Sequence, residues 1–172
     1  MAKKATTTKA TATPSPFQSL PHIIGKNPEI LILGTAPSAD SIAAKEYYAS
    51  PDNCFWDVIS ARYNGGKSFS NYSDKVDCLI ANKVALWDIL ASGMRVGSKN
   101  SKITNAKFND IRALLKKYPS IKRIVCNGKD VSDIIWKWFL PVPMFIAPNT
   151  SNASRLVVKT TSAKITIWRA FL

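Results

Sequence analysis

Four short, largely apolar runs constrain the fold of this 172-residue chain more than any other feature. They are EILIL (29–33), VALW (84–87), RIVC (123–126) and MFIA (144–147). Each run is continuous and does not alternate with polar residues, which is typical of strands that are covered on both faces. The runs therefore predict a sheet that lies between two layers of helices.

Helical patterns lie between and after these runs. Apolar residues recur with a period of about 3.6 in residues 108–118 and 131–140, and Ile165, Trp168 and Leu172 indicate a last helix. Strands that alternate with helices favour right-handed crossovers and a mainly parallel sheet. We therefore predict an α/β fold, a three-layer α/β/α sandwich with a central four-stranded, mainly parallel sheet.

The first 20 residues differ in composition from the rest. They are rich in Thr, Ala, Lys and Pro and contain almost nothing to bury, so we expect a disordered basic tail over 1–20 and a folded domain over 21–172. The tail carries three lysines and no acidic residue, so +10 of the formal net charge of +13 belongs to the domain. A charge excess of this size is typical of proteins that bind a polyanion, most often nucleic acid.

Targeting and membrane signals are weak. The N-terminus lacks the apolar region of a secretory signal, and no run approaches about 18 apolar residues. We expect a protein that is not secreted, works in the cytoplasm, nucleoid or nucleus, has no membrane partner and is a monomer.

Several kinds of site are disfavoured. The three cysteines are widely spaced and His22 is the only histidine, which argues against a disulfide framework, a metal site and a serine-type triad. A generic nucleotide-binding domain is disfavoured because no glycine-rich phosphate loop follows a strand. We expect neither a metal nor an organic cofactor.

The segments that directly follow the predicted strands are where a ligand should bind, because ligands of parallel sheets lie beyond the carboxyl ends of the strands. These segments are GTAPS (34–38), DILASGMRVGS (88–98), NGKD (127–130) and PNTSNASR (148–155).

These four segments, read with YYASPDNCFW (47–56), carry a family resemblance. GTAPS, the Tyr47-Tyr48 pair and PDNCFW resemble the uracil-DNA glycosylase superfamily, and within it the hypoxanthine-DNA glycosylase group with its pattern GSFPS, YY, PxNxFW. The last element also looks like that of the mismatch-specific uracil/thymine glycosylases. ALWDILASGMRVGS, Asn127-Gly128 and PNTSNA follow in the family's order. The resemblance implies a base-excision repair enzyme, and we expect a DNA glycosylase that removes hypoxanthine or uracil. No lysine is placed to form a Schiff base, so the enzyme should be monofunctional.

The resemblance and the chemistry of glycosidic-bond hydrolysis suggest roles for individual residues. Asn53 would be catalytic and orient the attacking water, while Phe55 would stack on the extruded base. Asp88 would accept a hydrogen bond from a ring N–H, and the backbone of the GTAPS loop would stabilise charge on the leaving base. The expected substrate-binding residues are Gly34, Thr35, Ala36, Pro37, Ser38, Tyr48, Phe55, Asp88 and Asn127. The expected DNA-binding residues are Arg95, Lys129, Asn149, Thr150, Ser151, Asn152 and Arg155.

The sequence also departs from the family pattern. Ala36 replaces an aromatic residue, Asn149 and Asn152 stand where serine and proline are usual, and Ala147 stands where some members have histidine. These departures motivate a second hypothesis, a DNA-binding module that kept the fold and lost the chemistry.

Plainer structural roles compete with the functional ones. Asn53 could cap a helix over 54–62, because Asn is a favoured N-cap, and Phe55 and Trp56 could be core residues. Asp88 could cap a helix or pair with Arg95, and Asn127-Gly128 is a common turn dipeptide.

Overall fold

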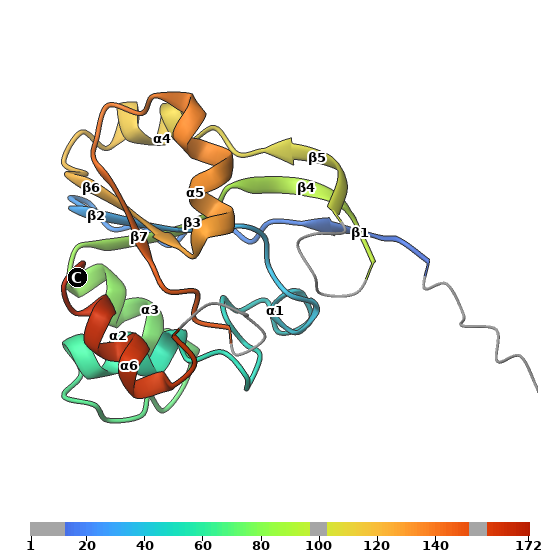
Figure 1. Cartoon of the computed structure of the whole chain (residues 1–172). Coiled ribbons are helices and arrows are strands. Elements are labelled where there is room, and N and C mark those ends of the chain that lie inside the picture. The colour runs from blue at the N-terminus through green and yellow to red at the C-terminus, as the bar shows by residue number, and fades with distance from the viewer. Residues whose placement is uncertain (1–12, 97–102, 152–157) are drawn as a thin grey trace, which may run out of the picture.

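A computed structural model of the chain describes residues 13–96, 103–151 and 158–172. Its centre is a parallel sheet of four strands in the order β3-β2-β6-β7 (Figure 1). The strands are β2 (Ile30–Gly34), β3 (Val84–Asp88), β6 (Arg123–Asn127) and β7 (Met144–Ala147). The four apolar runs form these strands, and the predicted α/β/α fold is confirmed.

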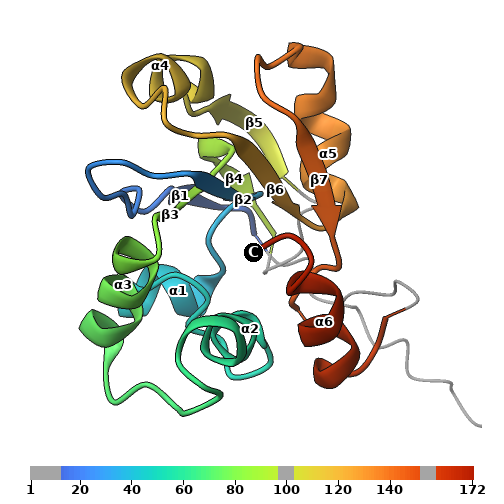
Figure 2. The same ribbon diagram turned by 90° about the vertical axis from the view of Figure 1, so that its left-hand side faces the viewer.

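Helices lie on both faces of this sheet (Figure 2). On one side are α1 (Ala39–Ala44), α2 (Phe55–Tyr63), α3 (Tyr72–Ala81) and α6 (Thr161–Trp168). On the other side are α4 (Ile111–Lys117) and α5 (Lys129–Ile135). Within the described part of the chain, none of the helices is long and apolar enough to cross a membrane.

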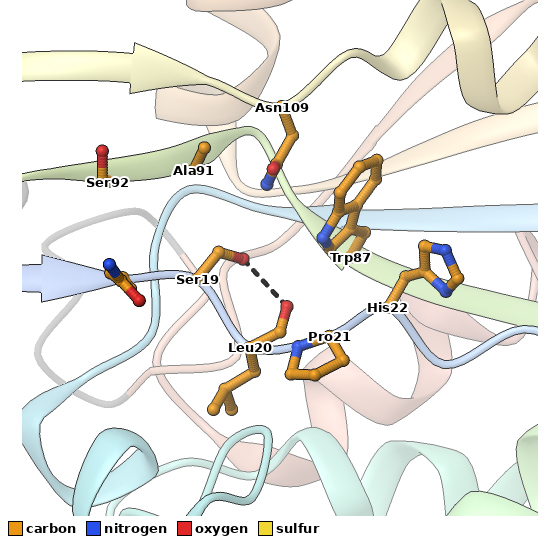
Figure 3. A pocket seen from close by; sticks show the side chains of 9 residues that line it. Ser19, Leu20, Pro21, His22, Trp87, Ala91, Ser92 and Asn109 are labelled. Carbon is orange, nitrogen blue, oxygen red and sulfur yellow. Dashed lines mark hydrogen bonds between the residues drawn. The ribbon is translucent and has the colours of Figure 1, made fainter.

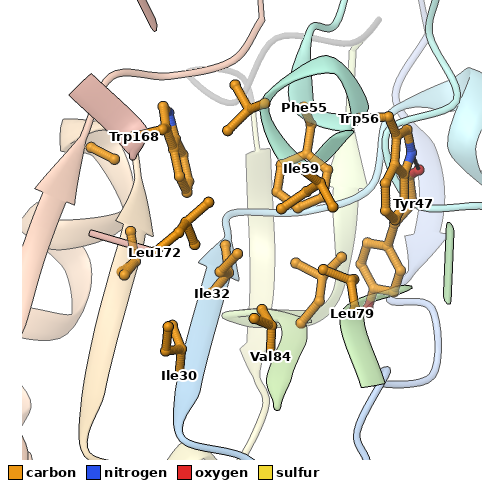
Figure 4. Close-up of a cluster of buried hydrophobic side chains, with 14 of the residues drawn as sticks. Ile30, Ile32, Tyr47, Phe55, Trp56, Ile59, Leu79, Val84, Trp168 and Leu172 are labelled. Carbon is orange, nitrogen blue, oxygen red and sulfur yellow. Dashed lines mark hydrogen bonds between the residues drawn. The ribbon is translucent and has the colours of Figure 1, made fainter. Parts of the chain in front are cut away.

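The core is divided by the sheet into two apolar clusters. Ile30 and Ile32 of β2 belong to the cluster beneath α2, α3 and α6, where Phe55 and Trp168 also lie (Figure 4). Leu31 and Leu33 belong to the second cluster, with the buried residues of α4 and α5. Successive side chains of a strand point to opposite faces, so a strand buried on both sides must be apolar throughout.

A second sheet of three antiparallel strands was not predicted. It contains β1 (Ser15–Gln18), β4 (Leu90–Arg95) and β5 (Ile103–Phe108) in the order β1-β4-β5. We expected a loop after β3, but β4 begins almost directly after that strand ends. Its sequence LASGMR has little strand propensity of its own, and pairing on both sides stabilises it.

The expected disordered tail is wrong for residues 15–18, which form β1. Phe17 is buried there, and a Cβ atom added to Gly93 would lie only 2.9 Å from the Phe17 ring. Glycine in β4 thus allows the Phe17 ring to pack closely against the strand. Residues 1–12 lie outside the described part of the chain.

Two predicted helices have different bounds in the structure. The helix expected over 108–118 begins at Ile111, after a cap in which the Asp110 side chain accepts from the Ala113 N–H (2.8 Å), and Phe108 instead ends β5. The helix expected over 131–140 is α5, followed by the short 3₁₀ helix η2 (Trp136–Trp138).

Candidate active site

The carboxyl ends of the four parallel strands meet at one edge of the sheet. Gly34 is paired with Asp88 across β2 and β3, and Asn127 is paired with Ala147 across β6 and β7. Asp88 and Asn127 are both buried at this edge. Buried polar groups therefore gather where the sequence places the site.

Gly34 allows three groups to approach one another closely. A Cβ atom at this position would overlap the Asp88 carboxylate and lie 3.0 Å from the Tyr48 hydroxyl oxygen. Any larger residue would have to displace one of these side chains. The end of β2 thus brings together a carboxyl group and a phenol from two other segments.

Asp88 is a buried carboxyl group whose Oδ2 atom has no hydrogen-bond partner among the described residues; 3% of the residue is exposed. Burial raises the pKa of Asp88 from its usual 3.8 to about 7, although the Arg95 guanidinium opposes this shift. Arg95 itself donates to the Pro37 carbonyl oxygen (2.7 Å). The alternative role of Asp88, a simple pair with Arg95, therefore does not account for its Oδ2 atom, which has no hydrogen-bond partner among the described residues.

Tyr48 presents an aromatic ring at the site. Its ring is stacked on that of Phe55, with the centroids 4.0 Å apart and an interplanar angle of 23°. Phe55 has no exposed surface, whereas Tyr48 is partly exposed. The expected stacking of Phe55 on a base is therefore wrong in this structure, because Tyr48 covers Phe55. Phe55 and Trp56 are core residues, as the plainer alternative proposed.

Asn127 fixes the position of two neighbours. Its Nδ2 atom donates to the Tyr48 hydroxyl (3.0 Å) and to Thr150 Oγ1 (2.9 Å), and its Oδ1 atom accepts from the Thr150 N–H (2.9 Å). These bonds occupy both amide hydrogens of Asn127 but only one lone pair of its Oδ1 atom, so the expected contact of Asn127 with a base remains a prediction. The next residue, Gly128, has φ 102° and lies against Asn149, so it is more than a generic turn glycine.

Asn53 lies at the start of α2. Its Oδ1 atom accepts from the Phe55 N–H (3.0 Å), and the residue forms an isolated antiparallel bridge with Ser151. The N-cap of α2 is Cys54, so Asn53 lies one residue before the position that the plainer alternative gave it, although its side chain still contacts the helix N-terminus. The Asn53 Oδ1 atom can still accept a second hydrogen bond, because a carbonyl oxygen has two lone pairs and Asn53 is partly exposed.

The segment 149–151 connects Asn53 to the strand ends. Ser151 pairs with Asn53, while Thr150 is bonded to Asn127, which in turn holds the Tyr48 hydroxyl. The Tyr48 hydroxyl and the Asp88 carboxylate both lie against Gly34. The catalytic candidate and the turn after β2 thus lie on the same side of the sheet, in one connected cluster.

The GTAPS loop is held by several contacts. The Thr35 carbonyl oxygen accepts from the Leu90 N–H (3.0 Å), Pro37 accepts from Arg95, and Ser38 caps α1 by accepting from the Ser41 N–H (3.1 Å). Ala36 packs against the apolar cluster on the α4 and α5 side. The expected role of this loop's N–H groups remains a prediction.

The residues expected to bind DNA have different surroundings. Arg95 is buried, with its guanidinium 5.0 Å from the centroid of the Phe17 ring, and Thr150 is fully buried, so phosphate contacts by these two are wrong. Lys129 is exposed and pairs with Asp133 (2.5 Å). The Asn149 side chain accepts from the Ser151 N–H (2.8 Å). Asn152 and Arg155 lie outside the described residues.

Two residues of α6 were missed by the sequence reasoning. Lys164 is buried and donates to the Ser151 carbonyl oxygen (3.0 Å), and Trp168 is buried and donates to that of Pro148 (2.8 Å). Residues four apart on a helix share one face, so a lysine four residues before a core tryptophan was the available signal.

A pocket of about 460 Å³ lies beside this cluster, along β3 and β4 (Figure 3). It is lined by residues 18–22 together with Trp87, Ala91, Ser92 and Asn109. The His22 and Trp87 rings form a T-shaped pair with their centroids 5.3 Å apart. None of the predicted catalytic or substrate-binding residues lines it.

Known proteins are similar to this chain in sequence and in fold. The uracil DNA glycosylase superfamily matches residues 21–172. Two proteins named hypoxanthine DNA glycosylase are similar: one from Methanosarcina acetivorans is 34% identical over 67% of this chain and 73% of its own length. The other, from Methanosarcina barkeri, is 35% identical over 65% and 71%. The solution NMR structure of a candidate uracil DNA glycosylase from M. acetivorans superimposes with a TM-score of 0.75 at 28% identity, over 91% of this chain and 98% of that one. The chain belongs to the uracil DNA glycosylase superfamily.

Proposed function

We propose that the chain is a monofunctional DNA glycosylase that hydrolyses the N-glycosidic bond of hypoxanthine or uracil in DNA. Its class, a DNA N-glycosylase, follows from the superfamily and from the two similar proteins named hypoxanthine DNA glycosylase. The choice of base rests on the residues at the carboxyl edge of the sheet. The hypothesis of an inactive DNA-binding module is not favoured.

The observation that carries this choice is the Oδ2 atom of buried Asp88, which has no hydrogen-bond partner in the described part of the chain. Hypoxanthine carries a hydrogen on N1 and uracil one on N3, whereas adenine and cytosine, from which they arise by deamination, have a lone pair at the same ring positions. An ionised carboxylate accepts from the first pair of bases and repels the second. Asp88 therefore suits a base with a ring N–H, which hypoxanthine and uracil share with guanine and thymine, and it disfavours adenine and cytosine.

Tyr48 would provide the surface on which the extruded base stacks. One face of its ring is supported by Phe55, and its backbone φ of 53° together with the hydrogen bond from Asn127 fixes its orientation. A non-glycine residue with positive φ is unusual and persists only where its surroundings impose it. A rigid ring can contribute about 1–3 kcal/mol per stacked base.

Asn53 would orient the attacking water through the second lone pair of its side-chain carbonyl. Its bond to the Phe55 N–H keeps that carbonyl at the start of α2. Loss of the base leaves negative charge on it, which the N–H groups of the 34–38 loop would stabilise. Because an electron-poor base leaves readily, little acid catalysis is needed, and a site without histidine is sufficient.

DNA is the partner that fits this chemistry and the formal charge of +13. Lys129, Asn149 and Ser151 are the described residues that we propose to contact the nucleic acid, together with Asn152 and Arg155. We further propose that the protein acts as a monomer, without a metal or organic cofactor, in the cytoplasm, nucleoid or nucleus.

The proposal is tested with oligonucleotides that each contain one hypoxanthine, uracil, xanthine or hydroxymethyluracil. Asn53→Ala should lower the single-turnover rate roughly 10²- to 10⁴-fold while the Kd for DNA stays the same, because it removes a group that acts on the water. Asn82→Ala, an exposed asparagine that follows α3, is the matched control. Strands should break only after alkali. Equal rates for Asn53→Ala and the natural chain would rule out the proposed catalytic role.

A further inference from the structure

Helix α6 donates two hydrogen bonds to the segment that carries Ser151. Lys164 Nζ donates to the Ser151 carbonyl oxygen (3.0 Å), and Trp168 Nε1 donates to the Pro148 carbonyl oxygen (2.8 Å). The two residues are four apart and lie on one face of the helix. The helix therefore holds both ends of residues 148–151.

This segment also touches the proposed catalytic asparagine. Ser151 forms the antiparallel bridge with Asn53, and the Thr150 carbonyl oxygen accepts from the Cys54 N–H (3.1 Å). Thr150 is bonded to Asn127 on its other side. A shift of 148–151 would move Asn53 relative to Tyr48.

Lys164 is an unexpected residue for a purely structural contact. It is 1% exposed, and burying an ammonium group is costly unless a specific interaction compensates for it. Trp168 already anchors α6 in the core through its fully buried ring, 6.2 Å from that of Phe55. An apolar residue at 164 would be sufficient for packing. The role of the ammonium group is therefore its hydrogen bond to the Ser151 carbonyl oxygen.

We propose that Lys164 is a positioning residue for the glycosylase reaction: its ammonium group fixes the Ser151 carbonyl and, through the bridge to Ser151, the orientation of the Asn53 side chain. This inference rests on the proposed function of Asn53. Lys164 does not act as a nucleophile on the sugar, because its nitrogen is buried and hydrogen-bonded to the backbone.

The test compares Lys164→Met, which keeps the length of the side chain and removes the charge, with Lys116→Met on an exposed face of α4. Lys164→Met should lower the single-turnover rate roughly 10- to 100-fold, the scale of a misplaced catalytic group, with the Kd for DNA unchanged. Lys116→Met should keep the natural rate. In the Asn53→Ala background, Lys164→Met should cause no further loss of rate, because the group that it positions is absent.

Two outcomes overturn the proposal: a natural rate in Lys164→Met, or the same fold-loss in the presence and absence of Asn53. If the methionine variant does not fold, Lys164→Arg decides, since it keeps the charge but moves the donor atoms. A lowered rate at unchanged Kd then supports the proposal, and a natural rate overturns it.

A second readout does not depend on activity. In ¹⁵N–¹H correlation spectra, Lys164→Met should shift the side-chain amide signals of Asn53, and Lys116→Met should leave them in place. If the natural chain excised no base while this shift was seen, the proposed function would fail and the structural link would stand. Unshifted Asn53 signals in Lys164→Met would overturn the link itself.

Discussion

Two carboxyl groups at opposite ends of the parallel sheet have pKa values that are shifted in opposite directions. Glu29, just before β2, lies at the surface and accepts from Lys122 and Lys83 at 2.7 Å each; these bonds lower the pKa of Glu29 to about 2. Asp88, at the end of β3, is buried with one oxygen unpartnered among the described residues, and its pKa rises to about 7. Ion pairing satisfies the first group, whereas no described residue satisfies one oxygen of the second.

The paired Glu29 and the buried Asp88 have different consequences for the stability of the fold and for its function. A surface ion pair adds little to the free energy of folding, but it also costs little. A buried carboxyl group without a partner reduces stability, and such groups are concentrated at sites that bind or react. Three predictions test this contrast between the two ends.

The largest expected effect is on excision by Asp88→Asn. Loss of the charged acceptor should lower kcat/KM for hypoxanthine roughly 10- to 100-fold at pH 8. In the natural chain, kcat/KM should fall as the pH drops below about 7, because the protonated carboxyl group accepts poorly; the variant should show no such fall between about pH 5 and 7. Rates measured across this pH range check both points.

The exposed Asp74→Asn on α3 is the matched control, and its pH profile should follow that of the natural chain. A profile of Asp88→Asn that still falls below pH 7 would assign the titration to another group.

A smaller effect is expected on stability. The folded pKa of Asp88 lies above the unfolded value, so its favourable contribution is present below about pH 4 and is lost as the pH rises through about 7. The stability of Asp88→Asn relative to the natural chain should therefore be greater at pH 8 than at pH 5, by about 2 kcal/mol. Urea unfolding at the two pH values measures this. An equal difference at both would show that Asp88 is ionised without penalty.

The smallest effect is expected from Glu29→Gln. The substitution keeps the shape and removes the charge from two exposed ion pairs, so Tm at neutral pH should stay close to that of the natural chain, and added salt should reduce any difference. The depressed pKa of Glu29 means that its contribution is present above pH 4.5 and is lost as the pH falls through about 2. Thermal unfolding at low and high salt is the measurement. A large loss of Tm would mean that the stability of the fold also depends on the charge of Glu29 at the amino end of the parallel sheet.

Local patterns were sufficient for the parallel sheet and the region of the site. The apolar runs of β2, β3, β6 and β7 gave the four strands, because burial on both faces demands apolar residues at every position. The motifs after these strands located Gly34 and Asp88, because the carboxyl ends of parallel strands must meet at one edge. Asn53 was identified through the family resemblance of PDNCFW. They did not reveal β4, whose residues LASGMR become a strand only by pairing with β1 and β5.

Side-chain roles within the site depended on contacts between distant segments. Phe55 and Tyr48 are both aromatic and close in sequence, and only the packing of α2 against the sheet decides that Phe55 is buried behind Tyr48. Likewise, Arg95 and Thr150 carry polar groups that suit phosphate, yet burial directs those groups to the protein's own backbone and to Asn127. Sequence determines which chemical groups the chain carries and which strand ends they follow. Only the tertiary structure decides which of them face solvent, because exposure depends on neighbours brought from elsewhere in the chain.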